Sequence, residues 1–386
     1  MIRELLSEEY KRFPKHWKIV PFNEAFQDKT GGQTKIQRKD YLENGEIPII
    51  DQGQDLIGGY TNENHSICKI NLPCIIFGDH TKIFKFITQP FALGADGVKV
   101  LYHADNINSK FAYYFLKTLD LPDVGYSRHF RFLKRTFFPI PPIAEQKRIA
   151  AILDKADRVR RKRKEAIRLT EELLRSVFLE MFGDPVTNPK GWEIKPLEEI
   201  ADLLTGYPFK SQEYVGSAEG IRLCRGANVL PDVIGWSDVC YWNSKELNQY
   251  QRFSLEVKDI VIALDRPWIS SGLKIAVVTS SDLPTLLVQR VARIRPYQIE
   301  MQFYLYLLLR HPAFEKHCCL TETTIPHISP RDLRTYLVPV PSIEHLQKFN
   351  SFIDKTLSAG MISKSQYKEM ENLFNSLLQR AFRGEL

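Results

Sequence analysis

Apolar and polar residues follow two different spacings along this chain. In residues 17–138, and again in 192–338, apolar residues form short runs separated by Gly, Asn and Asp. Such runs between turn-forming residues are typical of β-strands. The runs lie at residues 47–50, 74–77, 98–101, 260–264 and 291–294. Each stretch also holds a short aromatic-rich helical run, at 111–116 and 304–309, so both stretches predict mixed α/β domains.

The second spacing is helical and occupies residues 143–182 and 343–382. No Gly or Pro interrupts the first segment, and its apolar residues recur at heptad spacing. About two apolar positions per heptad form a narrow seam, which favours a coiled coil over a broadly buried helix. The predicted seam holds Ile149, Ala156, Val177, Ile152, Val159, Ala166 and Leu173 in the first helix, with Leu153, Ile167, Leu174 and Met181 beside it, and Phe349, Met370, Leu377, Phe352, Ala359 and Leu373 in the second.

Both spacings occur twice because the chain contains an internal repeat. Pro14 and Trp17 recur 175 residues later as Pro189 and Trp192. The turn at 139–143 recurs at 339–343, an offset of 200 residues that holds without a gap to the ends of both helical segments. A register kept over some forty positions indicates a tandem duplication. We therefore expect the two long helices to pack antiparallel, with the copies related by a pseudo-two-fold axis.

The repeat divides the chain into four segments. The first globular domain is predicted at residues 1–142 and the first long helix at 143–184. The second globular domain follows at 185–342 and the second long helix at 343–386.

Composition adds less than the repeat does. The net charge of +7 is a weak indication of a polyanionic partner, because many basic proteins bind no nucleic acid. No run of eighteen apolar residues occurs, and acidic residues interrupt the N-terminal segment where a signal peptide would be apolar. The six cysteines form no C-x-x-C pair and are predicted to be buried reduced thiols. We therefore expect a cytoplasmic protein without a metal site.

The sequence contains no recognisable catalytic motif. It lacks a phosphate-binding G-x-x-x-x-G-K-[ST] loop, a methyltransferase motif and the common hydrolase motifs. Asp232, Glu256 and Lys258 have a spacing compatible with a Mg²⁺-dependent nuclease, but the first copy has no counterpart. An alternative without catalysis is a basic scaffold that binds protein or RNA. Two diverged copies on a symmetric frame fit the recognition of a two-part DNA site better than either alternative.

Three segments carry a resemblance to a known family. They are Pro139-Ile-Pro-Pro-Ile-Ala-Glu-Gln-Lys-Arg-Ile149, Pro339-Val-Pro-Ser-Ile343 and the closing Leu377-Leu-Gln-Arg-Ala-Phe-Arg-Gly-Glu-Leu386. With the order of two variable domains and two like helices, they resemble the specificity (S) subunit of type I restriction–modification enzymes. The resemblance covers nearly the whole chain.

The resemblance implies a fold and a set of partners. Each globular segment would be a target-recognition domain that reads half of a split site in duplex DNA, and the helices would fix the gap. The partners would be two methyltransferase (M) subunits and, in some systems, restriction/translocase (R) subunits. The chain itself would be no enzyme and carry no cofactor, since S-adenosylmethionine, ATP and Mg²⁺ would belong to the partners. Glu145 and Gln146 are candidate partner contacts; the second copy departs here and has His345-Leu346.

Candidate DNA contacts are polar and basic residues in loops between strands. In the first domain they are Gln52, Gln54, His80, Lys82, Arg128, His129 and Arg131. In the second they are Arg222, Arg225, Asn228, Arg266, His327 and Arg331. Arg266 is expected at the place of His80, because Asp79 and Asp265 follow analogous strands, and His327 and Arg331 at the places of Arg128 and Arg131.

Two further features allow more than one interpretation. The basic run Arg160, Arg161, Lys162, Arg163 and Lys164 is either a solvated helical face or a contact to DNA phosphates. Trp17 and Trp192 are predicted to anchor domain cores rather than to stack on bases.

Overall fold

The computed structural model describes residues 13–95, 97–123, 125, 127–319 and 326–386, without the side chains of 357–369. The chain forms two compact units, Met1–Glu165 with Ser363–Leu386, and Ala166–Ile362. Each unit contains one predicted α/β domain together with parts of both long helices. No helix among these described residues is long and apolar enough to cross a membrane.

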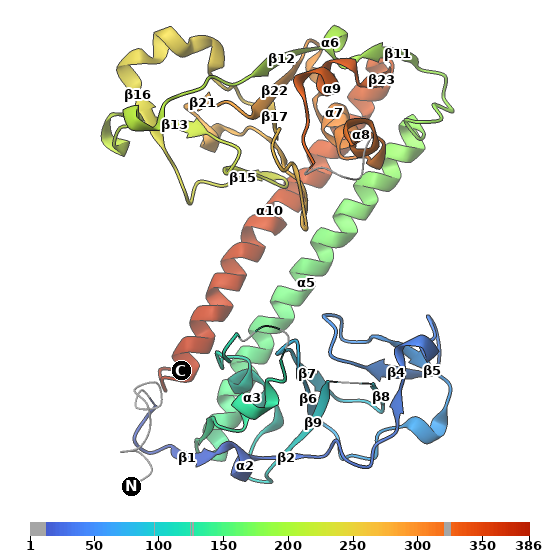
Figure 1. Cartoon of the computed structure of the whole chain (residues 1–386), viewed down its shortest axis with the longest axis vertical. Coiled ribbons are helices and arrows are strands. Elements are labelled where there is room, and N and C mark those ends of the chain that lie inside the picture. The colour runs from blue at the N-terminus through green and yellow to red at the C-terminus, as the bar shows by residue number, and fades with distance from the viewer. Residues whose placement is uncertain (1–12, 96, 124, 126, 320–325) are drawn as a thin grey trace. The chain divides into compact units, whose positions relative to one another are not determined.

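Two four-stranded sheets build the first unit (Figure 1). The central sheet is antiparallel, and its buried strand β6 explains the unbroken apolar run at residues 74–77. Its order is β2 (Phe26–Asp28), β9 (Val98–His103), β6 (Cys74–Gly78) and β7 (Phe84–Ile87). The second sheet has the order β3 (Lys35–Ile36), β8 (Ala92–Gly94), β4 (Ile47–Ile50) and β5 (Gly59–Thr61). Helix α3 (Ser109–Leu116) packs on β6 and β7.

The second unit repeats this topology. Its central sheet has the order β12 (Ala201–Thr205), β22 (Val291–Pro296), β17 (Ile260–Ala263) and β20 (Ile275–Val277), and its second sheet has the order β16 (Tyr241–Asn243), β13 (Gly220–Cys224) and β21 (Thr285–Leu287). Strands β13 and β21 are parallel, as are β4 and β8. Helix α7 (Gln302–Leu309) takes the place of α3. The second copy adds the hairpins β14–β15 (Val229–Leu230, Val233–Ile234) and β18–β19 (Trp268–Ile269, Gly272–Leu273) and the helix α8 (Pro312–Cys318).

A two-stranded ribbon closes each domain. In the first unit β1 (Lys18–Pro21) pairs with β10 (Phe137–Ile140), so that Lys18 faces Ile140. In the second unit β11 (Glu193–Pro196) pairs with β23 (Leu337–Val340), so that Glu193 faces Val340. These partners differ by the same 175 and 200 residues that separate the repeated motifs. The structure therefore confirms the internal repeat residue by residue.

Two residues separate each ribbon from the long helix that follows it, α5 (Ile143–Phe182) or α10 (Ile343–Ala381). In the second unit, Phe178 and Phe182 near the end of α5 contact Phe349 near the start of α10, with ring centroids 6.2 and 5.0 Å apart. In the first unit, Arg160 of α5 lies over the ring of Phe374, near the end of α10. The pairing is therefore antiparallel, as predicted.

The predicted heptad seam is partly wrong. Leu153 and Leu174 are buried, whereas Val159 and Leu173, two of the expected seam residues, are exposed. Between Asp157 and Leu174 of α5 every residue is exposed or half-buried. The reason is that the two ends of α5 pack into domain cores with α3 and α7, so burial follows contacts with the domains and not the heptad spacing alone.

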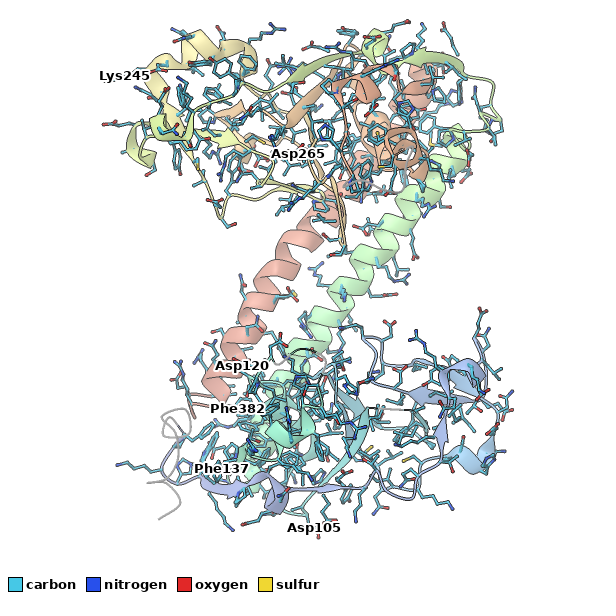
Figure 2. The ribbon with its side chains drawn as sticks, in the orientation of Figure 1. Asp105, Asp120, Phe137, Lys245, Asp265 and Phe382 are labelled. Atoms are coloured by element: carbon cyan, nitrogen blue, oxygen red, sulfur yellow. The ribbon has the colours of Figure 1, made fainter. Side chains whose placement is uncertain are left out.

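Aromatic side chains fill the space where α10 meets the first domain. Phe111 and Phe115 of α3 place their rings 5.5 and 5.3 Å from that of Phe382, which is labelled in Figure 2. Trp17 is buried in the same cluster, as predicted, whereas Trp192 in the second unit is only half-buried.

Truncation of Phe374 should strongly destabilise the first unit. Phe374 is 2% exposed and touches Tyr114, Lys117 and Arg160, so Phe374→Ala should lower the free energy of unfolding by roughly 3–5 kcal/mol. The neighbouring Leu373, 57% exposed, provides the control, and Leu373→Ala should change that energy by less than about 0.5 kcal/mol. Denaturant unfolding followed by fluorescence measures both. Equal effects of the two variants would show that α10 does not present this face to the domain.

The thiols should differ in reactivity. Cys68, Cys74 and Cys224 are buried, and burial raises the pKa of their thiols to about 11, 12 and 12. Because the thiolate is the reactive form, these three should resist a disulfide reagent at pH 8 in the native protein and react only after unfolding. The other three cysteines are half-buried, not fully buried as predicted. Burial also raises the pKa of Cys318 to about 12 and raises that of Cys319, so Cys240 should account for any rapid native reaction. Six rapidly reacting native thiols would contradict this burial.

Candidate nucleic-acid interface

Several candidate residues of the first unit meet at one turn. The turn follows β6, where Asp79 N–H donates to the carbonyl of Gly97 at 2.6 Å and His129 N–H donates to the carbonyl of Asp79 at 2.8 Å. Gln52 joins from the second sheet, because its Oε1 accepts from His80 N–H at 3.3 Å and its carbonyl accepts from Thr81 Oγ1 at 2.8 Å. Segments from four parts of the sequence thus converge after one strand.

The exposed side chains around this turn are polar or basic. Lys82 has a left-handed backbone, with φ of 59°, and its Nζ lies 3.6 Å from Asp123 Oδ1. Arg131 donates to Ser127 Oγ at 3.3 Å and lies over the ring of Phe132. Gln54, Arg128 and Arg131 are exposed. The turn therefore presents positive charge and amide groups to solvent.

The expectation that His129 lies on this surface is wrong. His129 is 1% exposed, and its Nδ1 lies 2.9 Å from the carbonyl of Asp79. The buried carboxylate of Asp79 accepts from Phe130 N–H at 2.6 Å, at the start of α4 (Phe130–Leu133). Both side chains therefore hold the turn together, and a buried imidazole cannot reach a DNA groove.

The second unit forms the same turn after β17. Leu264 N–H donates to the carbonyl of Arg290, and Ile328 N–H donates to the carbonyl of Leu264, both at 2.9 Å. These bonds match those of Asp79, because Ala263 pairs with Val291 as Gly78 pairs with Val98. Candidates from two distant segments, Arg266 and His327, are thereby brought to one turn.

This register corrects two expected correspondences. Leu264 takes the place of Asp79, so Asp265, not Arg266, stands where His80 does. His327 does correspond to Arg128, but Arg331 falls one residue beyond the place of Arg131. Arg266 and Arg331 are nevertheless exposed, and Arg266 has a left-handed backbone with φ of 45°.

The cluster of Arg222, Arg225 and Asn228 serves the fold. Arg222 donates to the carbonyls of Ser281 and Leu283 at 2.9 and 2.8 Å and lies over the ring of Trp236. Arg225 pairs with Asp238 at 2.8 Å. The Asn228 side chain is 1% exposed and donates to the carbonyls of Gly235 and Asp238. The expectation of an exposed Asn228 was wrong, because its amide lies inside the fold and joins these two backbone segments.

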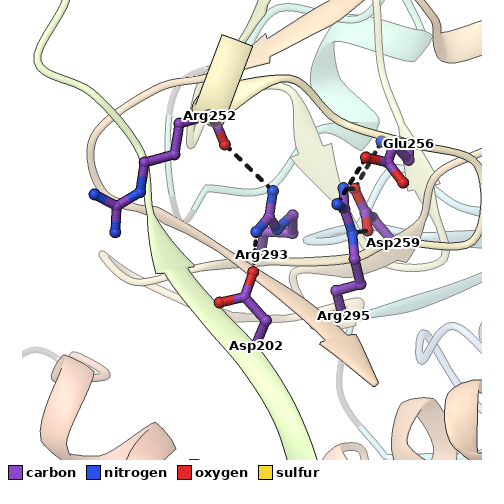
Figure 3. A network of polar contacts seen from close by, with 6 residues as sticks. All are labelled: Asp202, Arg252, Glu256, Asp259, Arg293 and Arg295. Carbon is purple, nitrogen blue, oxygen red and sulfur yellow. Dashed lines mark hydrogen bonds and ion pairs between the residues drawn. The ribbon is translucent and has the colours of Figure 1, made fainter. Parts of the chain in front are cut away.

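Strand β22 holds two more arginines in a carboxylate network (Figure 3). Buried Arg293 pairs with Asp202 and donates to the carbonyl of Arg252 at 3.4 Å. Arg295 donates to both carboxylate oxygens of Asp259, at 2.6 and 2.8 Å, and these bonds raise its pKa. Both guanidinium groups therefore bind carboxylates of the fold.

The nuclease-like set is dispersed in the structure. Glu256 pairs with Arg295 at 2.7 Å, and Asp232 pairs with Arg310 at 2.8 Å and accepts from Tyr306. Among the residues that the structure describes, no group of three or more His, Cys, Asp or Glu side chains could hold a metal ion.

The basic run of α5 divides into paired and exposed residues. Arg160 and Arg161 pair with the buried carboxylate of Asp157, each at 2.7 Å, and Arg160 also lies 3.8 Å from Glu371 of α10. These two arginines therefore stabilise the helix. Lys162 and Lys164 are exposed, while Arg163 is half-buried.

The two candidate partner contacts at the start of α5 face inward. Gln146 is fully buried, donates to the carbonyls of Asn106 and Pro141, and accepts from Asn108 N–H at 2.7 Å. The expectation that Gln146 meets a partner is therefore wrong. Glu145 accepts from Trp17 Nε1 at 3.3 Å; in the second copy His345 packs edge-on against Trp192 instead. Glu145 and His345 thus both contact the tryptophan at the start of their domain, one by a hydrogen bond and the other by ring packing.

Sequence reasoning missed Arg290 and Thr81 at the two turns. Arg290 is exposed and pairs with Asp265. No pattern marked it, because a lone arginine before a strand carries no signal until the pairing of β17 with β22 places it beside Asp265.

Duplicated α/β domains, each presenting one polar turn and each followed by a long helix, define a two-armed binding protein. The chain belongs to the family of the type I restriction modification DNA specificity domain, whose model matches residues 14–169 and 189–372.

Individual relatives agree with this assignment. The chain is 36% identical over 210 residues to the EcoAI specificity subunit of Escherichia coli, a match covering 51% of this chain and 34% of that protein. It is 29% identical over 251 residues to the MjaVIII specificity subunit of Methanocaldococcus jannaschii, covering 61% and 58%. These matches thus span less than two thirds of either relative. A crystal structure of an S subunit from M. genitalium shares the fold, with a TM-score of 0.64, 17% identity and coverage of 95% and 96%.

Two arginines should separate folding from surface roles. Arg222→Ala removes two hydrogen bonds from a charged group to backbone carbonyls and its contact with Trp236, and should lower the free energy of unfolding by about 1–3 kcal/mol. Arg266→Ala, at an exposed position, should change it by less than about 0.5 kcal/mol. Denaturant titrations compare them. An Arg222→Ala protein as stable as the wild type would show that these bonds do not stabilise the fold and would leave Arg222 a candidate DNA contact.

Proposed function

We propose that this chain binds a two-part site in duplex DNA and directs the partner subunits of a type I restriction–modification enzyme to it. One observation carries the proposal: the same hydrogen-bonded turn occurs in both units and presents different polar side chains in each. A repeated scaffold with changed side chains is what the reading of two different half-sites requires. The family assignment supports the same role and gives no support to the protein or RNA scaffold.

Each unit would read its half-site by two kinds of contact. Cations at the two turns, the half-buried Lys82 and the exposed Arg128 and Arg266, would contact phosphates and position the domain. Side chains fixed at the turn would contact base edges in the major groove. In this scheme residues 1–142 and 185–342 are the target-recognition domains, and 143–184 and 343–386 are the helices that set the gap between the half-sites.

Chemistry would belong to the partners. We infer that two M subunits bind S-adenosylmethionine and methylate the DNA, and that R subunits, where present, supply ATP- and Mg²⁺-dependent translocation and cleavage. The names of the relatives, specificity subunits of type I restriction enzymes, support this division of labour. The complex would act on DNA in the cytoplasm.

Selection from random duplexes tests the proposal. The purified chain, alone and with its M subunit, should retain duplexes that share two short fixed sequences separated by a constant gap. Binding should weaken steeply with salt, because phosphate contacts release counterions. Exchange of one recognition domain for that of a relative should change one half-sequence only. Retention without any enriched sequence, even with the M subunit, would contradict specific recognition.

A further inference from the structure

The two turns differ most at one equivalent backbone position. Gly97 in the first unit and Arg290 in the second both have left-handed backbones, with φ of 68° and 67°. A Cβ at Gly97 would lie 2.5 Å from Gln52 Oε1 and 2.7 Å from His80 Cδ2, so those side chains already occupy this space. In the second unit the position carries an arginine instead. A non-glycine residue held at such a φ is strained, and such strain is concentrated at functional sites.

Arg290 is both exposed and held. Its side chain is 71% exposed, and its Nη1 pairs with Oδ2 of Asp265. The other oxygen of that carboxylate, Oδ1, lies 2.9 Å from Nδ1 of His327. Asp265, labelled in Figure 2, is therefore fixed from a second segment and acts as a positioning residue for the guanidinium. An arginine ordered before binding loses less conformational entropy when it meets a ligand.

Three other arginines of this unit serve the fold instead. Arg222, Arg225 and Arg293 direct their guanidinium groups to carbonyls or carboxylates of the fold. Arg266 is exposed at the same turn. Phosphate contact requires only a cation within reach, whereas base recognition requires a donor fixed in direction.

We propose that Arg290, held by Asp265, recognises a guanine in the half-site bound by the second unit; this rests on the proposed function. Guanine presents two acceptors, N7 and O6, at the major-groove edge, and a guanidinium matches them with two parallel N–H donors. Adenine presents an amino donor where guanine has O6, so the second N–H of the guanidinium has no acceptor there. Because the Asp265 pair uses Nη1, other N–H groups of Arg290 remain for the base.

The experiment compares four versions of the full chain, with its M subunit, in the same random-duplex selection. Arg290→Gly is the main variant, because glycine accepts the left-handed φ and reproduces the first unit's Gly97. It should lose the preference for guanine at one position of one half-site. Arg290→Lys keeps a donor without the fork and should retain a weaker preference. Arg252→Ala, which removes an exposed arginine whose guanidinium points away from the network of Figure 3, should leave the motif unchanged.

Affinity on the selected sequence gives the size of the effect. Replacement of the contacted guanine by adenine should weaken wild-type binding by about 5- to 150-fold and leave the binding of Arg290→Gly almost unaltered. Thermal unfolding of each variant checks that the second unit stays folded.

The outcomes separate this inference from the proposed function. A wild-type motif in two parts that Arg290→Gly reproduces, or a change at a base other than guanine, would overturn the role of Arg290 while leaving the two-part reader intact. A change in both half-sites would overturn it equally. Absence of any motif for the wild type would remove the proposed function and this inference with it.

Discussion

Pairing of the first and last strands of each domain is the constraint on which the rest of the structure depends. The ribbons β1–β10 and β11–β23 bring the two ends of each α/β domain together, and the long helix leaves from that point. Because the register is the same in both copies, the helix starts from an equivalent place whatever the domain contains. Trp17 with Glu145, and Trp192 with His345, reinforce this closure by different contacts.

Within a domain closed in this way, small elements can be added without shifting the start of the long helix. The second copy adds two small hairpins and helix α8, yet both central sheets keep one strand order. The turn after the central strand is also kept, because backbone N–H and carbonyl groups form it. Side chains at the turn are therefore free to differ, with Gln52 and His80 in one copy and Asp265 and Arg290 in the other. Under the proposed function, this separates the frame from the specificity.

Sequence reasoning predicted the architecture well because a duplication is a long-range signal. The offsets of 175 and 200 residues recur in the strand pairing, and the predicted long helices are observed. Which neighbouring residues of the helix are buried could not be predicted. Leu153 is buried and Ile152 is not, because Leu153 packs into a core that residues of α3 and α10 complete. Heptad spacing describes one helix against another, whereas these helix ends pack into whole domains.

The candidate site was predicted less well, for a different reason. Loops rich in Arg, Asn and His look alike in a sequence whether they face solvent or satisfy buried carbonyl groups. The side chains of Asn228 and Gln146 do not face solvent; both donate hydrogen bonds to backbone carbonyls of the fold.

Arg290 was missed for the opposite reason, because nothing in the sequence marks it. A lone arginine becomes notable only when β17 and β22 place it beside Asp265. An exposed arginine in a flexible loop would lose several side-chain rotations on binding, and much of its attraction would be offset. At Arg290 the strained backbone and the ion pair have already restricted those rotations in the folded protein. In the role proposed for Arg290, part of the entropy of recognition is lost during folding, where the stability of the surrounding sheet compensates for it. In that role, specificity at this turn depends on the rigidity of the central sheet as much as on the arginine itself.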